Sequence, residues 1–295
     1  MSDTGPTHRM IDGVAVLTLR QADRPVVVLD WALLKAIDAA MDKVEAEANL
    51  KGFVLASDSR VFVAGADLKE IVGLDEKKLD EYLAFGQRVY GRIAKLPVPS
   101  VAALNGAALG GGLEIAMHCD DLIAAQPVGT PEKPAKPYLV GLVEAGLNIC
   151  PGWGGTNMLP ARMDPARAIE MTALGKPITV FDATEAGLIA ELAPANELID
   201  RAVARVKAMR PRGTGRPHCV SDDNVKALVK QGLQDVLPKL PSVDAAQTVA
   251  RCVQCGIEQG WQAALDMERQ ELNRLRYTPQ GKASIEAFFA KTAKA

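Results

Sequence analysis

The chain has 295 residues, of which 48% are apolar and 24% are charged, and its formal net charge is -2. This composition supports a sizeable buried core and excludes a chain that is disordered throughout. Because no excess of basic residues is available to neutralise phosphates, nucleic acid is not expected as a partner.

The N-terminus, residues 1–18, has no cationic start followed by an apolar run, so it is not typical of a signal peptide. The longest uncharged stretch, residues 96–113, contains two prolines and four glycines. A membrane helix needs about 20 mostly apolar residues, and this stretch is too short and too interrupted. We therefore expect a cytoplasmic protein with no membrane partner.

In the first half of the chain, strands and helices are predicted to alternate. The apolar run Val14–Leu19 is typical of a buried strand, and apolar residues recur every three or four positions from Trp31 to Ala48, which predicts a helix. Further strands are predicted at 52–56, 97–103 and 122–125, and further helices at 76–92 and 113–119. This alternation predicts a layered α/β domain.

The second half is predicted to be mainly helical. Residues 126–137 hold four prolines without apolar periodicity, which favours an exposed loop that resembles an insertion. Helices are predicted at 166–174, 183–187 and 196–209, and again from Val225 to the end, after a linker at 211–217. We therefore expect an α/β core over residues 1–205 and a helical region over residues 206–295.

Five cysteines, an odd number spread thinly along the chain, do not indicate a disulfide framework. Cys252 and Cys255 form a CxxC pair, but zinc would need two more ligands at a matching spacing, and the sequence offers none. No metal site is therefore predicted.

Two glycine-containing turns could bind a substrate oxygen. Gly110, Gly111 and Gly112 precede a predicted helix, whose first amides carry partial positive charge and can stabilise an anion or a thioester oxygen. The turn at 62–67 also follows a predicted strand and could supply a second amide to the same oxygen. The alternative for the glycine triplet is a tight strand-to-helix turn with no ligand.

Two glutamates, Glu114 and Glu144, lie among apolar residues near these glycine turns. Carboxylates are rarely buried unless they are paired or used, and burial disfavours the charged form, which suits general acid–base catalysis. The alternative is that each carboxylate ends a helix or turn and faces solvent.

Three segments together resemble the signatures of the enoyl-CoA hydratase/isomerase, or crotonase, superfamily. They are Phe62–Lys69, Pro97–Asp120 with its glycine triplet, and Val140–Thr156, where Glu144 precedes a Pro-Gly-x-Gly-Gly-Thr turn by seven residues. The resemblance extends from about Val14 to Asp200. The chain is also similar to the hydratase portion of fatty-acid oxidation multienzymes; since no dehydrogenase half follows, a free-standing version is expected.

The resemblance implies a crotonase-like (ClpP/crotonase) α/β fold, a spiral of ββα units with a helical C-terminal part. It implies an oxyanion hole made by the amides of Ala66 and Gly111. It also implies substrate-binding residues that line the coenzyme A site, namely Ala64, Gly65, Asp67, Leu68 and Lys69. Coenzyme A would be part of the substrate, no metal or other cofactor is expected, and relatives usually form trimers or dimers of trimers.

The activity that the resemblance implies is hydration of a 2-enoyl-CoA thioester, as in β-oxidation of fatty acids. Glu114 would activate the water that adds at C3, and Glu144 would deliver a proton to C2. Family patterns often have proline at the position of Val143 and glycine at the position of Asn148, so these two residues depart from them. An enoyl-CoA isomerase, a decarboxylase, an acyl-CoA hydrolase and a non-catalytic acyl-CoA-binding subunit remain alternatives, and acyl chain length is open.

Overall fold

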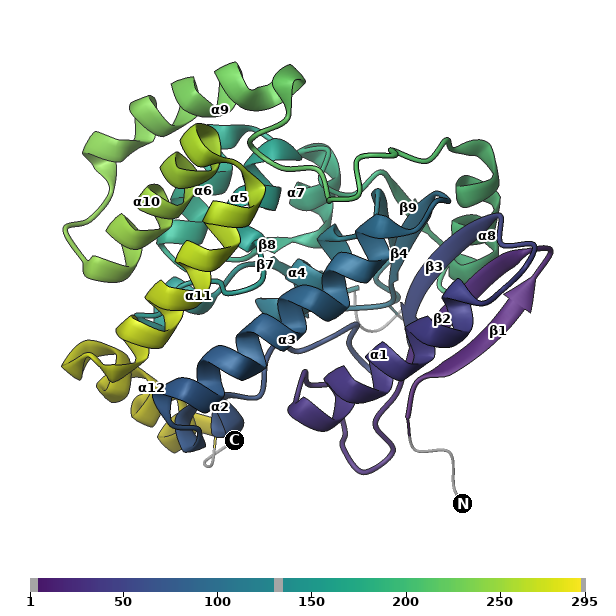
Figure 1. The fold of residues 1–295 in the computed structure, drawn as a ribbon, viewed down its shortest axis with the longest axis horizontal. Helices are drawn as coiled ribbons and strands as arrows, with labels where there is room; N and C mark the ends of the chain where they lie inside the picture. The colour runs from purple at the N-terminus through teal and green to yellow at the C-terminus, as the bar shows by residue number, and fades with distance from the viewer. Residues whose placement is uncertain (1–4, 130–134, 293–295) are drawn as a thin grey trace. The chain divides into compact units, whose positions relative to one another are not determined.

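The computed structural model describes residues 5–129 and 135–292 and contains two compact units, each built from segments that are far apart in sequence (Figure 1). The first unit comprises the described parts of 1–66, 88–140 and 178–217. The second comprises the described parts of 67–87, 141–177 and 218–295. The predicted loop at 126–137 falls partly outside the described residues, so its role stays a prediction.

The first unit is organised around a six-stranded sheet with the strand order β1-β2-β3-β4-β6-β9. Only β1 runs antiparallel to its neighbour; every other pair is parallel, as in the register that aligns Val14 of β2 with Gly52 of β3. A smaller sheet has the order β5-β7-β8. The strands are β1 (Thr7–Ile11), β2 (Val14–Leu19), β3 (Gly52–Ser57), β4 (Ser100–Leu104), β5 (Ala108–Leu109), β6 (Asp121–Ala125), β7 (Leu139–Gly141), β8 (Ile178–Thr179) and β9 (Glu191–Ala193).

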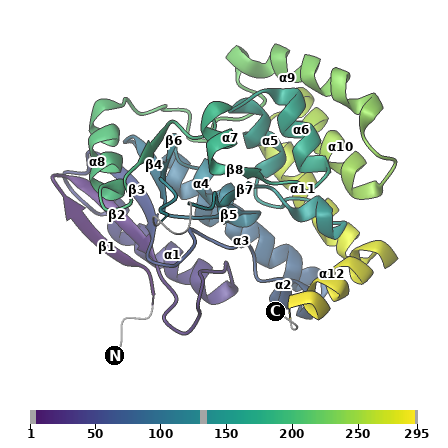
Figure 2. The ribbon, with the colours of Figure 1, turned by 180° about the vertical axis from the view of Figure 1, so that it is seen from behind.

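Helices cover both faces of the large sheet, which explains why its central strands are apolar along their whole length. Helix α8 (Leu198–Ala208) packs on one face and shares a core with alternate residues of β2, β3, β4 and β6. Helices α1 (Trp31–Glu45) and α4 (Gly111–Met117) lie on the other side (Figures 1 and 2). Asp30 caps α1 by accepting a hydrogen bond of 2.7 Å from the Leu33 amide. The unit also contains α7 (Val180–Glu185) and the C-terminal part of α3 (Glu76–Lys95).

The second unit is helical. Its main core lies among α6 (Pro165–Ala173), α9 (Asp223–Val236) and α10 (Asp244–Gln259), whose inward residues include Ile169, Val229 and Val249. The other elements are α2 (Leu68–Gly73), the first part of α3, η1 (Glu144–Leu147), α5 (Gly155–Met158), η2 (Leu159–Ala161), η3 (Leu237–Lys239), α11 (Trp261–Tyr277) and α12 (Pro279–Thr292).

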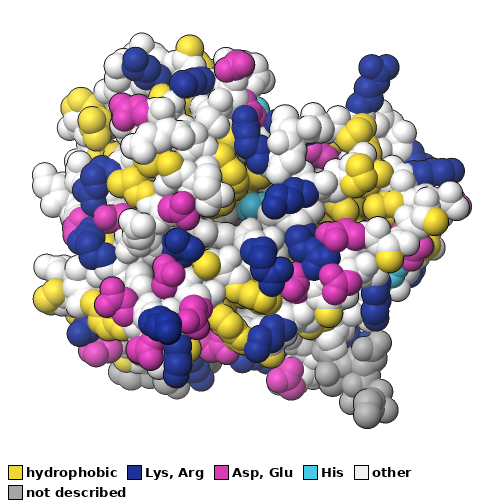
Figure 3. Space-filling view, in the orientation of Figure 1, with side chains coloured by type: hydrophobic (Ala, Val, Ile, Leu, Met, Phe, Trp, Pro, Cys, Tyr) yellow, Lys and Arg dark blue, Asp and Glu magenta, His cyan; other side chains and the backbone are white. Residues whose placement is uncertain are grey.

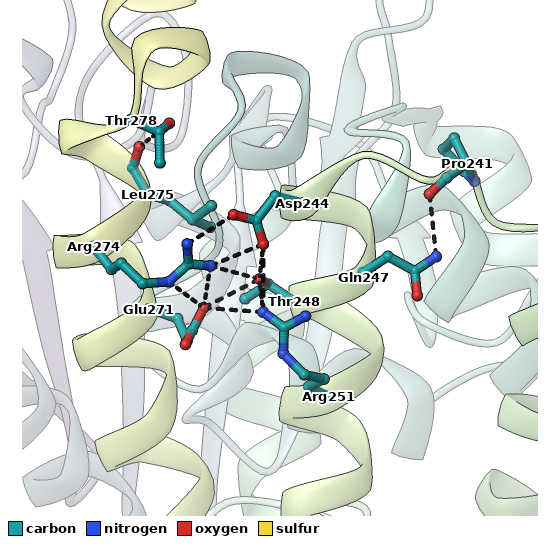
Figure 4. A network of polar contacts seen from close by, with 9 residues as sticks. All are labelled: Pro241, Asp244, Gln247, Thr248, Arg251, Glu271, Arg274, Leu275 and Thr278. Carbon is teal, nitrogen blue, oxygen red and sulfur yellow. Dashed lines mark hydrogen bonds and ion pairs between the residues drawn. The ribbon is translucent and has the colours of Figure 1, made fainter.

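A charged network fixes α11 to α10 (Figure 4). The Arg274 guanidinium donates to both oxygens of Asp244, at 2.7 and 2.9 Å, and to Glu271 at 2.6 Å. Arg251 of α10 donates to Thr248 at 2.6 Å and to the same Glu271 oxygen at 3.2 Å. Because the charges come from both helices, the network fixes the axial register of α11 against α10.

Removal of Arg274 should produce a stability loss that depends on pH. Hydrogen bonds from Arg274 lower the pKa of Asp244. Burial acts to raise the pKa of Glu271, but the bonds and charges of Arg274 and Arg251 outweigh it and lower that pKa. Such acids stabilise the folded state above their unfolded pKa values of about 3.9 and 4.3, and this contribution is lost as pH falls through the folded values.

We therefore expect Arg274→Met to lower the free energy of unfolding at pH 7 by about 1 kcal/mol or less, because the partners are partly exposed. The difference between the variant and the parent should shrink as the pH falls below about 4. Urea midpoints at pH 7 and pH 3 measure it; an equal difference at both values would contradict the electrostatic interpretation.

The sequence predicted the α/β class and most elements correctly. It missed the strands β1, β5, β7, β8 and β9 and the helix α2. It also began the helix of Glu114 at Leu113, whereas α4 already includes Gly111 and Gly112. The helix predicted for residues 31–48 ends at Glu45. The division into residues 1–205 and 206–295 stays a prediction, because the compact units interleave along the chain.

The sequence contains nearly equal numbers of basic and acidic residues, 34 and 36. On the face drawn in Figure 3, side chains of both signs are interspersed rather than gathered into one field. Among the described residues, none of the helices combines the length and the apolar character that a bilayer crossing needs.

Candidate active site

The predicted turn at 62–67 has its residues 62–66 in the first unit, beside the segment that leads into α1. The Ala64 amide donates to the Val27 carbonyl at 2.9 Å, and the Leu29 amide donates to the Gly65 carbonyl at 2.9 Å. Gly65 has a φ of 117°, which a residue with a side chain adopts only under strain. Ala64 is exposed, Gly65 is buried and Ala66 is half-buried, so the turn reaches the surface of its unit.

The second predicted turn packs directly against the first. Val63 forms a parallel bridge with Ala108, and the Leu109 amide donates to the Val63 carbonyl at 3.3 Å. Gly110, with a φ of 52°, then reverses the chain into α4. A side chain at Gly112 would place its Cβ only 2.4 Å from the Val63 carbonyl oxygen. Two glycines of the triplet therefore have a structural reason: Gly110 adopts a positive φ, and Gly112 packs closely against the Val63 backbone.

The amides of Ala66 and Gly111 are the two donors predicted to form the oxyanion hole. Within the part of the chain that the structure describes, neither amide donates a hydrogen bond. The parallel bridge between Leu29 and Ala66 is formed by backbone groups of the residues before and after Ala66, not by the Ala66 amide. Gly111 is the first residue of α4, and the first amides of a helix have no acceptor within the helix. Two neighbouring turns of one unit thus each carry an amide that makes no hydrogen bond within the described residues, and a role for these amides in binding a ligand stays a prediction.

Glu114 lies on α4, in the same unit as both turns. Its side chain is only 1% exposed, and the adjacent Leu113 and Ile115 are fully buried. The apolar setting predicted for this carboxyl group is therefore confirmed. His118 ends the same helix with its ring edge-on to Tyr90 at 5.7 Å, as expected for a packed structural histidine.

Glu144 belongs to the second unit, where it begins the 3-10 helix η1. Asn148 takes a left-handed conformation with a φ of 55° and closes this tight helical turn. The Ile149 amide donates back to the Glu144 carbonyl at 3.2 Å, and the Asn148 side chain donates to Ser284 of α12 at 2.7 Å. Glu144 is half-buried, and its convergence with Glu114 stays a prediction.

The predicted coenzyme A residues beyond Ala66 form the start of α2. The Asp67 carboxylate caps this helix by accepting from the Lys69 amide at 2.8 Å and the Glu70 amide at 3.4 Å. Asp67 is buried, Leu68 is half-buried and the Lys69 side chain is exposed. Asp67 therefore has a structural role as a helix cap, whereas Lys69 is accessible for an anionic ligand.

Sequence reasoning missed Glu268, a fully buried acid on α11. Its carboxyl group accepts hydrogen bonds from the Gly154 amide, the Thr156 amide at 2.9 Å and the Thr156 hydroxyl. These donors belong to the Pro-Gly-x-Gly-Gly-Thr turn, which caps α5. The partners are 112 residues apart in sequence, so no local pattern could have indicated the contact.

Most of the chain matches a known protein family. Residues 9–273 match the family described as enoyl-CoA hydratase/isomerase. The chain belongs to this family. Its fold is that of the solved enoyl-CoA hydratase/isomerase structures it resembles, so the predicted crotonase-like fold is confirmed.

Three relatives illustrate the similarity of this enoyl-CoA hydratase/isomerase family member to known proteins. The alpha subunit of the fatty acid oxidation complex of Idiomarina loihiensis is 32% identical over 293 residues, which cover 95% of this chain and 40% of the relative. An enoyl-CoA hydratase from Bacillus anthracis superimposes with a TM-score of 0.61 at 26% identity, covering 97% of this chain and 96% of that one. An enoyl-CoA hydratase/isomerase from Xanthobacter autotrophicus Py2 gives 0.68 at 23% identity, covering 97% and 93%.

Proposed function

We propose that this member of the enoyl-CoA hydratase/isomerase family is an enoyl-CoA hydratase that adds water across the 2,3 double bond of a 2-enoyl-CoA thioester. The observation that carries the proposal is the pair of amides without an internal acceptor, at Ala66 and Gly111, in turns that pack against each other. A carbonyl oxygen that gains negative charge during reaction needs two such donors. The buried Glu114 in the same unit supplies the acid–base group.

In the proposed reaction the amides of Ala66 and Gly111 bind the thioester oxygen and stabilise the charge that develops on it. Glu114 takes a proton from water as the new C3–O bond forms, and Glu144 gives a proton to C2. The carbon–carbon double bond becomes single, and the proton taken by one carboxylate balances the proton given by the other. The reaction so written needs no metal and no redox group; coenzyme A is part of the substrate.

The similarity to a fatty acid oxidation complex subunit supports β-oxidation as the setting of this proposed reaction. We also propose that the chain assembles as a homotrimer or a dimer of trimers and acts in the cytoplasm. Light scattering of the purified protein measures the oligomeric state.

The test is hydration of crotonyl-CoA, followed as the loss of absorbance of its conjugated double bond. Turnover at about 1 to 1000 per second, the usual range for enzymes, is expected. Formation of a 2-enoyl thioester from 3-enoyl-CoA without hydration would favour an isomerase instead. Binding of CoA esters without any turnover would favour a non-catalytic subunit. A series of enoyl-CoA chain lengths then defines the preferred acyl group.

A further inference from the structure

The buried carboxyl group of Glu268 is hydrogen-bonded to the 154–156 turn, so each restricts the movement of the other. The two oxygens of Glu268 accept hydrogen bonds from the Gly154 amide and from both Thr156 donors. Since Gly154 has a φ of 100° and caps a helix of only four residues, the turn needs external support. Glu268 supplies that support from α11.

Helix α11 is itself rigidly attached within its unit. The network in Figure 4 fixes it to α10 through Arg274. On a neighbouring stripe, the Asn273 side chain donates to the Glu76 carbonyl at 2.8 Å, and Arg276 donates to the Leu74 carbonyl at 2.7 Å. These contacts hold the helix that carries Glu268 in place.

The chain from this turn to Glu144 is short and tightly held. The Gly152 carbonyl accepts from the Gln87 side chain at 2.9 Å, and the Cys150 thiol lies 3.6 Å from the Glu268 carbonyl oxygen. A Cβ at Gly152 would come within 2.8 Å of Leu272, one turn of α11 beyond Glu268. The Ile149 amide then closes the turn onto the Glu144 carbonyl. The residues between Gly154 and Glu144 are thus held at several successive points, so we expect a shift at Gly154 to be transmitted to Glu144.

We propose that Glu268 is a positioning residue for Glu144: its buried carboxyl group fixes the 154–156 turn and, through residues 149–152, the direction of the Glu144 side chain. The inference rests on the proposed function, because it assigns Glu268 an effect on the proton delivered to C2. Glu268 does not contact substrate in this role.

Replacement of Glu268 by Gln keeps the shape of the side chain but turns one acceptor into an NH₂ donor. Whichever oxygen is replaced, the new NH₂ group faces a backbone N–H of the turn, either that of Gly154 or that of Thr156. Two donors cannot hydrogen-bond to each other, so the turn must shift. Displacement of a catalytic group by about 1 Å can lower the rate about 100-fold. We expect Glu268→Gln to lower kcat by about 10- to 100-fold and to leave KM and CoA-ester affinity unchanged.

The decisive experiment repeats Glu268→Gln in a Glu144→Gln background, with single-turnover rates at high enzyme concentration. A residue that acts through Glu144 should change the residual rate by less than about twofold there. An undiminished loss in both backgrounds would overturn the proposal in favour of general loosening, as would a wild-type kcat for Glu268→Gln. Glu258→Gln, the same change at an exposed site on α10, is the matched control.

Hydrogen exchange provides a readout that does not need activity. Amides of residues 144–150 should exchange about tenfold faster in Glu268→Gln than in Glu258→Gln, because local opening becomes easier. Equal acceleration across α6, α9 and α10, or none at 144–150, would overturn the proposal. If the parent protein hydrates no crotonyl-CoA while residues 144–150 still respond, the proposed function fails and the positioning of the turn stands.

A milder pair of variants covers the case in which Glu268→Gln does not fold. Thr156→Val removes one donor to Glu268 at nearly constant volume, whereas Thr156→Ser keeps the hydroxyl. Thr156→Val should reproduce the kinetic and exchange changes at smaller amplitude, and Thr156→Ser should restore parental values. Equal behaviour of the two variants would contradict the assignment.

Discussion

Replacement of Glu114 or Glu144 by Gln is expected to slow hydration of crotonyl-CoA by about 100- to 10,000-fold, the range typical of a lost general acid or base. Glutamine keeps the size and the hydrogen-bonding outline of each side chain but cannot exchange a proton with water or with C2. CoA-ester binding should be retained, because the amides of Ala66 and Gly111 are unchanged. Steady-state kinetics and calorimetry on a non-reactive acyl-CoA measure the two effects separately.

Matched controls exist in each unit. Glu185→Gln, at an exposed site on α7 of the first unit, controls for Glu114. Glu170→Gln, at an exposed site on α6 of the second unit, controls for Glu144. Both controls should keep parental rates. If Glu114→Gln and Glu144→Gln also keep parental rates, the acid–base assignment is wrong, whatever the stability of the variants.

The substitution Gly112→Ala is expected to impair both stability and catalysis. Its Cβ would lie 2.4 Å from the Val63 oxygen and 2.8 Å from the Val63 Cβ, and both neighbours belong to a buried bridge that cannot easily move. Overpacking of this kind costs about 1–3 kcal/mol of folding free energy. Because the same displacement moves the Gly111 amide, we expect an additional loss of about 100-fold in kcat.

Gly91→Ala, on α3 of the same unit, is the matched control. No atom lies within 4 Å of its built Cβ. Alanine in a helix is favoured over glycine by about 0.8–1 kcal/mol, so this variant should be slightly more stable than the parent and equally active. Thermal denaturation and crotonyl-CoA kinetics on both variants make the comparison. A Gly112→Ala protein with parental Tm and kcat would show that the two turns do not need their close contact.

Features that depend on neighbouring residues were predictable from sequence. The buried strands were evident in Val14–Leu19, the burial of Glu114 followed from the apolar residues beside it, and the glycine triplet indicated a close backbone approach. Strand β1 was missed because its sequence, THRMI, is half polar, as suits an edge strand with one neighbour. Helix α2 was missed because six residues carry almost no periodic signal.

Features that depend on distant residues were not predictable in this way. The contact of Gly112 with Val63 explains why glycine is needed at this position, yet the sequence shows only that glycine is there. The bonds of Glu268 to the 154–156 turn cross 112 residues or more. The 3-10 turn that begins at Glu144 was not predicted either; it is closed by Asn148, a residue other than glycine that adopts the left-handed conformation.

Helix α11 carries two sets of anchors on adjoining stripes. Glu268 and Leu272 face the turn that follows Glu144. Asn273 and Arg276 donate hydrogen bonds to the carbonyls of Glu76 and Leu74, between α2 and α3. The helix α11 therefore connects the 154–156 turn to the segment between α2 and α3. An insertion of one residue near the start of α11 would rotate every later side chain by about 100° about the helix axis. Both sets of contacts would then be lost together. Loop grafts or fusions are better made outside residues 261–277, where they leave this mechanical link intact.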